Sequence, residues 1–180
     1  MYKVFLQKID KLYNDDRKKL WTGTILYGNL YEDRWQTNIQ KPLNLEELHS
    51  LEDEIGNMPN DFKEFLLTSN GCYLFDILRV AGKQNGYRGM TIEEQIHQPI
   101  SFRNISPYSR NTKHLDGLFV FADSMLTGTF FAYNEEGQIL QLELRTFKPI
   151  NTYQTLMELL EAVYEAGERL VINKEYLDFE

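Results

Sequence analysis

The chain of 180 residues is poor in cysteine and in long apolar runs. Cys72 is its only cysteine, so no intramolecular disulfide can form and a reducing compartment is expected. A lone cysteine without an activating partner is typical of a small buried hydrophobe, not of a nucleophile. Gln7 and Lys8 interrupt the apolar start too early for an export signal, and no segment approaches the ~20 apolar residues of a membrane span. The expected location is the cytoplasm.

Basic residues are also outnumbered, because 19 Lys and Arg face 27 Asp and Glu and leave a net charge of −8. Polyphosphate repels such a chain, so we expect no nucleic-acid binding. The basic run Arg17-Lys18-Lys19 directly follows Asp15 and Asp16 and indicates a solvated helix end. An acidic surface favours a basic protein partner, because long-range attraction speeds the encounter.

Residue types that carry catalysis or hold metals are scattered along the chain. Carboxylate neighbours such as Glu46-Glu47 point apart on a helix and form no acid/base pair. The glycines between residues 82 and 89 lack the lysine and the strand–loop–helix setting of a phosphate loop. No nucleophile-elbow pattern surrounds Ser124. The histidines lie outside metal-ligand spacing: His49, His97 and His114. The sequence therefore predicts no enzyme activity, no metal and no cofactor.

What the chain does contain is the composition of a globular protein, with 42% hydrophobic and 13% aromatic residues. Apolar residues recur at helical spacing over 2–20, which predicts an amphipathic helix. Residues 24–27 suggest a short strand, and the polar stretch 31–42 reads as a connection. We therefore expect residues 1–42 to form an N-terminal extension packed on a main domain of residues 43–180.

The start of the main domain carries clear helix signals. Asn44 with Glu47 matches a capping box, the apolar residues that follow predict one buried face, and Gly56 ends the helix. Pro59 opens a second helix, which Asn70-Gly71 stops. The buried face of the first helix is expected to contain Leu45, Leu48, Leu51 and Ile55. Residues 72–80 then read as a single strand.

The rest of the chain reads as an irregular segment, a β-hairpin and a final helix. Within residues 82–117, Thr91 with Glu94 suggests a short capped helix. Strands are expected over 118–122, 128–133 and 138–144, with a hairpin turn at 134–137. A helix over 152–166 ends near Gly167. The sequence thus predicts an α+β fold: an antiparallel or mixed sheet flanked by helices, with an N-terminal helical extension.

Together these helix signals form a pattern that resembles the N-terminal signature of the SUKH superfamily. The resemblance covers residues 43–165, and the implied fold agrees with the predicted one. Its motif residues, most of which have structural explanations, are Glu52, Pro59, Phe62, Phe65, Asn70 and Gly71. Residues 1–40 lie outside the pattern, which leaves the subfamily open.

The resemblance implies a protein that acts by binding another protein. Bacterial SUKH members are immunity proteins that neutralise cognate polymorphic toxins, many of which are nucleases, and the net charge of −8 suits a basic toxin. The alternative is a regulatory scaffold like the family's yeast cell-wall assembly regulators. The toxin's identity, the oligomeric state and the role of residues 1–42 stay open. Residue types suggest these partner contacts: Tyr87, Arg88, Tyr108 and Asp123.

Overall fold

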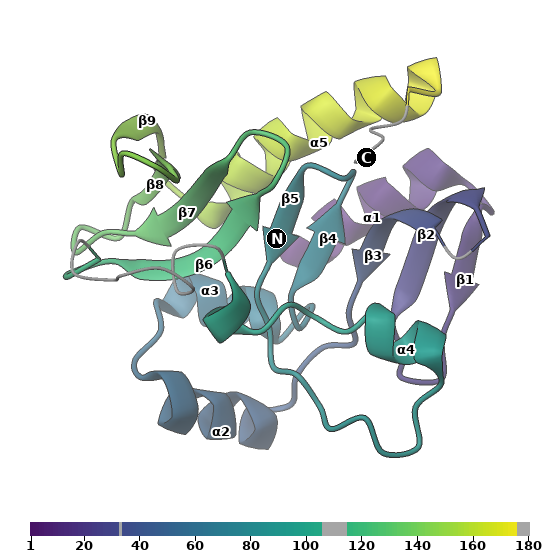
Figure 1. Ribbon diagram of the computed structural model, residues 1–180, viewed down its shortest axis with the longest axis horizontal. Helices are drawn as coiled ribbons and strands as arrows, with labels where there is room; N and C mark the ends of the chain where they lie inside the picture. The colour runs from purple at the N-terminus through teal and green to yellow at the C-terminus, as the bar shows by residue number, and fades with distance from the viewer. Residues whose placement is uncertain (33, 106–114, 176–180) are drawn as a thin grey trace.

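The structure is a computed structural model that describes residues 1–32, 34–105 and 115–175. Within those residues, nine strands form one antiparallel sheet in which each strand pairs with the next along the chain (Figure 1). The strands are β1 (Arg17–Lys19), β2 (Ile25–Tyr31), β3 (Arg34–Ile39), β4 (Cys72–Leu74), β5 (Leu78–Val80), β6 (Phe119–Ser124), β7 (Thr129–Tyr133), β8 (Ile139–Glu143) and β9 (Pro149–Tyr153). The predicted α+β class is confirmed, and the sheet is antiparallel throughout.

Helices cover both faces and one end of this sheet. The helices are α1 (Tyr2–Tyr13), α2 (Leu45–Ile55), α3 (Asn60–Leu66), α4 (Ile92–Ile96) and α5 (Leu156–Asn173), with a 3-10 turn at Phe102–Asn104. Helices α1 and α5 pack together over one face, α2 and α3 lie at one end, and α4 crosses the opposite face (Figure 1). We call the face that α4 crosses the front face. None of the described helices is both long and apolar enough to span a bilayer.

The centre of the core is aromatic. Phe62 of α3 is fully buried, and its ring lies 5.1 Å from that of Phe121 and 6.2 Å from that of Phe65. Tyr2 of α1 packs edge-on against Phe65 at 5.4 Å. Helix α3 therefore joins the sheet to α1, and its two phenylalanines hold these layers together.

Local cap signals predicted the short helices correctly. Asn44 Oδ1 accepts the Glu47 N–H at 2.8 Å, and the Glu47 carboxylate accepts the Asn44 N–H at 2.9 Å. The same reciprocal box joins Thr91 and Glu94 at the start of α4. One detail differs: Leu45, expected on the buried face of α2, is 63% exposed because it occupies the first helical position, outside the packed turns.

The first helix is shorter than predicted. It ends at Tyr13, because Asn14 takes a φ of 54° and turns the chain. The basic run expected at a solvated helix end is instead strand β1 at the edge of the sheet. Two of its three cations have specific partners: Arg17 pairs with Asp10, and Lys18 with Glu93 at 2.7 Å.

The predicted connection over residues 31–42 is wrong, since it contains β3. The period-2 pattern is obscured there because buried positions of this strand are polar. Tyr13 Oη lies 2.9 Å from both Gln36 Oε1 and Thr37 Oγ1, and Thr24 Oγ1 donates to Gln40 Oε1 at 2.8 Å. These bonds let a polar strand lie inside the sheet.

The predicted strand 72–80 is a hairpin of two strands, β4 and β5. Phe75 and Asp76 turn the chain with φ values of 55° and 61°, conformations that L-residues rarely adopt. The Phe75 ring is fully buried against Gly167 of α5. Gly167 therefore does not end the helix as predicted; α5 continues to Asn173 and uses the missing Cβ to admit this ring. Strand β9, for which we made no prediction, precedes α5.

Candidate functional site

One row of side chains crosses the front face from strand to strand. Residues opposite each other in register share a face of an antiparallel sheet, so the pairings define the row. In order it contains Leu26, Asn38, Tyr73, Arg79, Asp123, Phe130 and Leu142. Its ends are apolar and covered, whereas its four central residues, which we call the polar row, are Asn38, Tyr73, Arg79 and Asp123.

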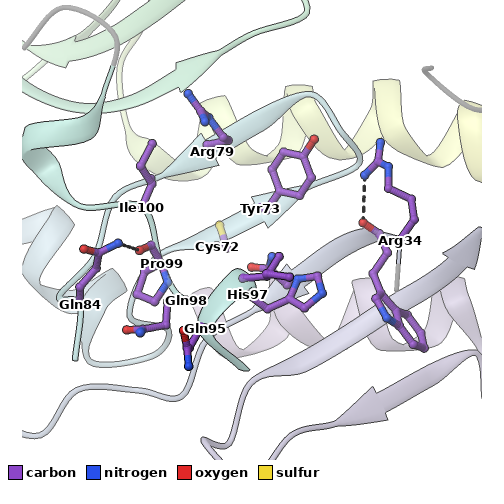
Figure 2. A pocket seen from close by; sticks show the side chains of 13 residues that line it. Arg34, Cys72, Tyr73, Arg79, Gln84, Gln95, His97, Gln98, Pro99 and Ile100 are labelled. Atoms are coloured by element: carbon purple, nitrogen blue, oxygen red, sulfur yellow. Dashed lines mark hydrogen bonds between the residues drawn. The ribbon is translucent and has the colours of Figure 1, made fainter. Parts of the chain in front are cut away.

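Three residues of the polar row, Asn38, Tyr73 and Arg79, line a hollow of about 470 Å³ (Figure 2). Tyr73 and Arg79 rise from neighbouring strands, and His97 and Gln98 lie across from them on the side of α4. Burial raises the pKa of the Tyr73 hydroxyl well above its usual value, so the group stays protonated and donates or accepts hydrogen bonds. The hollow is thus a concave surface with polar groups in its floor.

Arg79, which lines the hollow, belongs to an ion pair. Arg79 donates from Nε and Nη2 to the two carboxylate oxygens of Asp123, each at 2.7 Å. The Asp123 side chain is 1% exposed and that of Arg79 is 31% exposed. This two-bond geometry fixes the guanidinium and leaves Nη1 outside the pair. Because the charge is already compensated, a partner can cover Arg79 without burying a lone cation.

A second arginine lies at the edge of the hollow. Arg34 Nη1 donates to Asp76 Oδ1 at 2.7 Å in the β4–β5 turn. Asp76 is buried, and its Oδ2 has no hydrogen-bond partner among the described residues. Burial raises the pKa of Asp76 above its ordinary value, and Arg34 opposes that shift. The ionised carboxylate therefore opposes folding at neutral pH.

Asp76 should give the protein a pH-dependent stability that asparagine removes. The folded state holds the Asp76 proton more tightly than the unfolded chain does. The free-energy penalty of burying the ionised carboxylate is therefore complete above the raised pKa, and it vanishes as the pH falls to the ordinary pKa of an aspartate. Asp76→Asn tolerates the φ of 61° and carries no charge. We expect its stability relative to wild type to be greater at about pH 7 than at about pH 4 in urea unfolding.

The exposed Asp53→Asn in α2 is the matched control, since it removes a carboxylate that water already solvates. Its stability relative to wild type should not show this rise toward neutral pH. A pH profile of Asp76→Asn that runs parallel to that of wild type would contradict the assignment.

The rim of the hollow is a segment, residues 82–100, tied to the sheet at two points. Asn70 pairs with the backbone of Lys83 by two bonds, accepting its N–H at 2.6 Å and donating to its carbonyl at 2.8 Å. Gln40 Nε2 donates to the His97 carbonyl at 2.7 Å. Gln84 also bonds the Pro99 carbonyl at 3.0 Å within the rim. These bonds make the rim a fixed wall beside the polar row.

The motif residues expected to be structural have identifiable contacts. Glu52 forms an ion pair with Lys63 that ties α2 to α3, and Pro59 occupies the position directly before α3. Phe62 and Phe65 are the core residues described above. Gly71 takes a φ of 78°, and a Cβ there would stand 2.6 Å from the Val80 carbonyl oxygen. Asn70 follows the end of α3, as predicted, and it has a second role because its side chain holds the rim of the hollow through Lys83.

The predicted partner contacts are only partly brought together. Tyr87 and Arg88 lie exposed on the 82–100 segment, Tyr87 with 58% of its surface accessible. Asp123 is buried beside the hollow, where it holds the lining residue Arg79. Tyr108, like His114, lies outside the described residues. Their role in partner binding stays a prediction.

Sequence reasoning missed Tyr73 and Arg79. Each is half-buried and lies between two buried neighbours in its own short strand. This alternation could not be recognised while residues 72–80 were interpreted as a single strand. A turn placed at residues 75–77 would have aligned them on one face.

The described part of the site offers polar contacts, and its metal-ligand and thiol chemistry follows from its residues. Across the described ranges, no three His, Cys, Asp or Glu side chains cluster closely enough to hold a metal ion. Cys72 lines the hollow but is buried, and burial raises the pKa of its thiol well above the usual value. The thiol therefore stays protonated and is a poor nucleophile.

A comparison with protein-family models places most of the chain within a known family. The model of the SMI1 / KNR4 family (SUKH-1) matches residues 42–162, two thirds of the chain. Searches of curated proteins and of solved structures gave no match. The match begins just before α2 and ends inside α5, so it includes the polar row from Tyr73 onward and leaves out α1 and β1 to β3.

Proposed function

The chain belongs to the SMI1 / KNR4 family (SUKH-1), and from this membership we propose that it is an immunity protein that binds and neutralises a cognate polymorphic toxin. At the level of the family it is a toxin-immunity or SMI1/KNR4-like interaction module, a group that is generally non-enzymatic. The proposal is finer: the partner is one basic toxin of the nuclease type, and the encounter takes place in the cytoplasm.

The observation that carries the proposal is the polar row beneath a fixed rim. A concave surface with a compensated arginine and a protonated tyrosine presents hydrogen-bond groups without an unpaired buried charge. Covering the Arg79–Asp123 pair therefore buries no lone charge, which would cost more than covering a compensated one. A stable complex buries about 1,200–2,000 Å², so the partner must extend beyond the hollow to the rim and to Tyr87 and Arg88.

The support for a basic partner comes from acidic side chains on α2, at the end of the sheet, and not from the hollow itself, which is lined by Arg34 and Arg79. Gln84 lines both the front hollow and a smaller depression that reaches Glu54 of α2. Glu46 and Asp53 are also exposed on α2. With a net charge of −8, the molecule as a whole would attract a cationic protein from a distance. The association rate should therefore fall as salt is added.

We also propose that residues 1–42 are an addition to a family domain of residues 43–180. In support, the family match begins at residue 42, and α1 contacts α5 and β2. Strand β3 pairs with β4, so the addition extends the family's sheet and supplies Asn38 to the polar row.

Co-expression with the toxin encoded beside its gene tests the function. We expect the wild-type chain to abolish toxicity and to co-purify with the toxin. Tyr73→Ala removes a half-buried contact from the hollow and should weaken the complex by about 2 kcal/mol, or thirtyfold. Ile150→Ala, at an exposed position of the edge strand β9, should leave binding unchanged.

Unchanged toxicity in the presence of wild-type chain, with no co-purification, would reject the immunity function. Recovery of several housekeeping proteins in place of one toxin would favour the regulatory scaffold. Equal binding by Tyr73→Ala and Ile150→Ala would leave the immunity function intact and reject the front face as its site.

A further inference from the structure

A second groove lies on the far side of the β1–β2 turn from α4. It has a volume of about 470 Å³ and runs between the turn and α1. Its apolar lining includes Leu6, Ile25 and Ile39, and its charged residues are Lys19 and Lys41. No lining residue among those described carries a carboxylate, and none lines the front hollow. We call it the lysine groove.

Trp21 stands at the rim of the lysine groove with 99% of its surface exposed. Its backbone is nevertheless held in place. Within the turn, the Leu20 N–H donates to the Thr24 carbonyl at 2.9 Å and the Gly23 N–H donates to the Leu20 carbonyl at 3.0 Å. The Thr91 N–H and, less strongly, those of Trp21 and Thr22 lower the pKa of the Glu94 carboxylate in α4, so α4 lies against the turn. Neighbouring Lys18 adds an ion pair with Glu93 at 2.7 Å. An exposed indole on a braced turn is preorganised for an interface.

The charge of the groove is opposite to that of the chain. Lys19 and Lys41 are both exposed, and neither forms an ion pair with a described residue, although the chain has a net charge of −8. Lys41 is positioned by Gly23, whose missing Cβ would stand 3.1 Å from the lysine Cβ. Two uncompensated cations beside an apolar floor and an exposed indole complement a ligand that carries both carboxylates and apolar side chains.

We infer that the lysine groove binds an acidic segment of a partner protein, in which aliphatic or aromatic side chains lie next to Asp or Glu. Trp21 covers the apolar side chains, and the carboxylates pair with Lys19 and Lys41. This goes beyond the toxin complex proposed above, since the groove is lined by different residues and selects the opposite charge.

A library of random dodecapeptides, selected on the full-length chain, tests the inference. The recovered peptides should be enriched in Asp or Glu together with apolar residues. Binding of the best peptide should fall about thirtyfold with Trp21→Ala and about tenfold or more with Lys19→Glu/Lys41→Glu. Its binding should also shift the emission of Trp21 to the blue, because the indole leaves water.

Ile172→Ala, a 67% exposed position at the end of α5, is the control and should bind like wild type. Trp21 and both lysines are exposed, so each variant should unfold at the wild-type denaturant midpoint. Recovery of no peptides, or of peptides without acidic enrichment, would overturn the inference. The inference would also be overturned if Lys19→Glu/Lys41→Glu bound the best peptide as tightly as wild type does. A chain that selected no peptide but sedimented with phosphatidylserine vesicles, and did so only with both lysines present, would point to a membrane surface and overturn it as well. Toxin neutralisation by Trp21→Ala is a separate readout, so the two proposals can fail independently.

Discussion

Gly167→Ala is expected to destabilise the fold by about 3 kcal/mol, the upper end of the cost of overpacking a core. At an ordinary position inside a helix the same change would stabilise by up to ~1 kcal/mol, because alanine has the higher helix propensity. Here a Cβ would stand 2.0 Å from Cγ of Phe75. The ring is fully buried and belongs to a turn residue with a φ of 55°, so it has little room to move. Packing therefore outweighs propensity.

Urea unfolding of the single and double variants measures this effect. Phe75→Leu in the Gly167→Ala background should recover part of the lost stability, because leucine leaves space for the new methyl group. Ser50→Ala on the exposed side of α2 provides the propensity control and should be neutral or slightly stabilising. A neutral or stabilising Gly167→Ala would show that α5 does not seat Phe75 as described.

Arg79→Met is expected to cost about 3 kcal/mol of stability. It leaves the Asp123 carboxylate buried without its two-bond partner, and breaking a buried pair typically costs about 3–5 kcal/mol. The lower end applies because Arg79 is itself 31% exposed. Arg79→Met/Asp123→Asn removes both charges and should regain much of the loss. Chemical denaturation of the three proteins gives the coupling energy.

Arg103→Met is the matched control. Arg103 pairs with Glu54 at 3.5 Å, and the two side chains are 78% and 53% exposed. Exposed pairs contribute only about 0–1 kcal/mol. If Arg79→Met were as mild as Arg103→Met, the pair would not organise the floor of the hollow.

Signals that act within a few residues predicted their elements well. Asn44 with Glu47 and Thr91 with Glu94 fixed two helix starts, because both partners of each bond lie in one turn of helix. Strand β3 was missed because its polar side chains are satisfied by distant residues such as Tyr13. No local pattern reports such a partner.

The candidate site was harder to predict from the sequence than the fold class, because its residues are brought together by tertiary contacts. The turn at Phe75 and Asp76 lacks the glycine or asparagine of a usual hairpin, and packing on α5 holds it in place. Without that turn, Tyr73 and Arg79 could not be placed side by side. Asp123 was chosen from residue type as a partner contact, whereas the structure shows it holding Arg79.

The central claim is that the partner covers the front face, and amide hydrogen exchange with and without the purified toxin tests it most directly. The account predicts slowed exchange in β4, β5 and residues 82–100, with α1 and α5 unchanged. Protection confined to the face covered by α1 and α5, with the front strands exchanging as in the free protein, would contradict it.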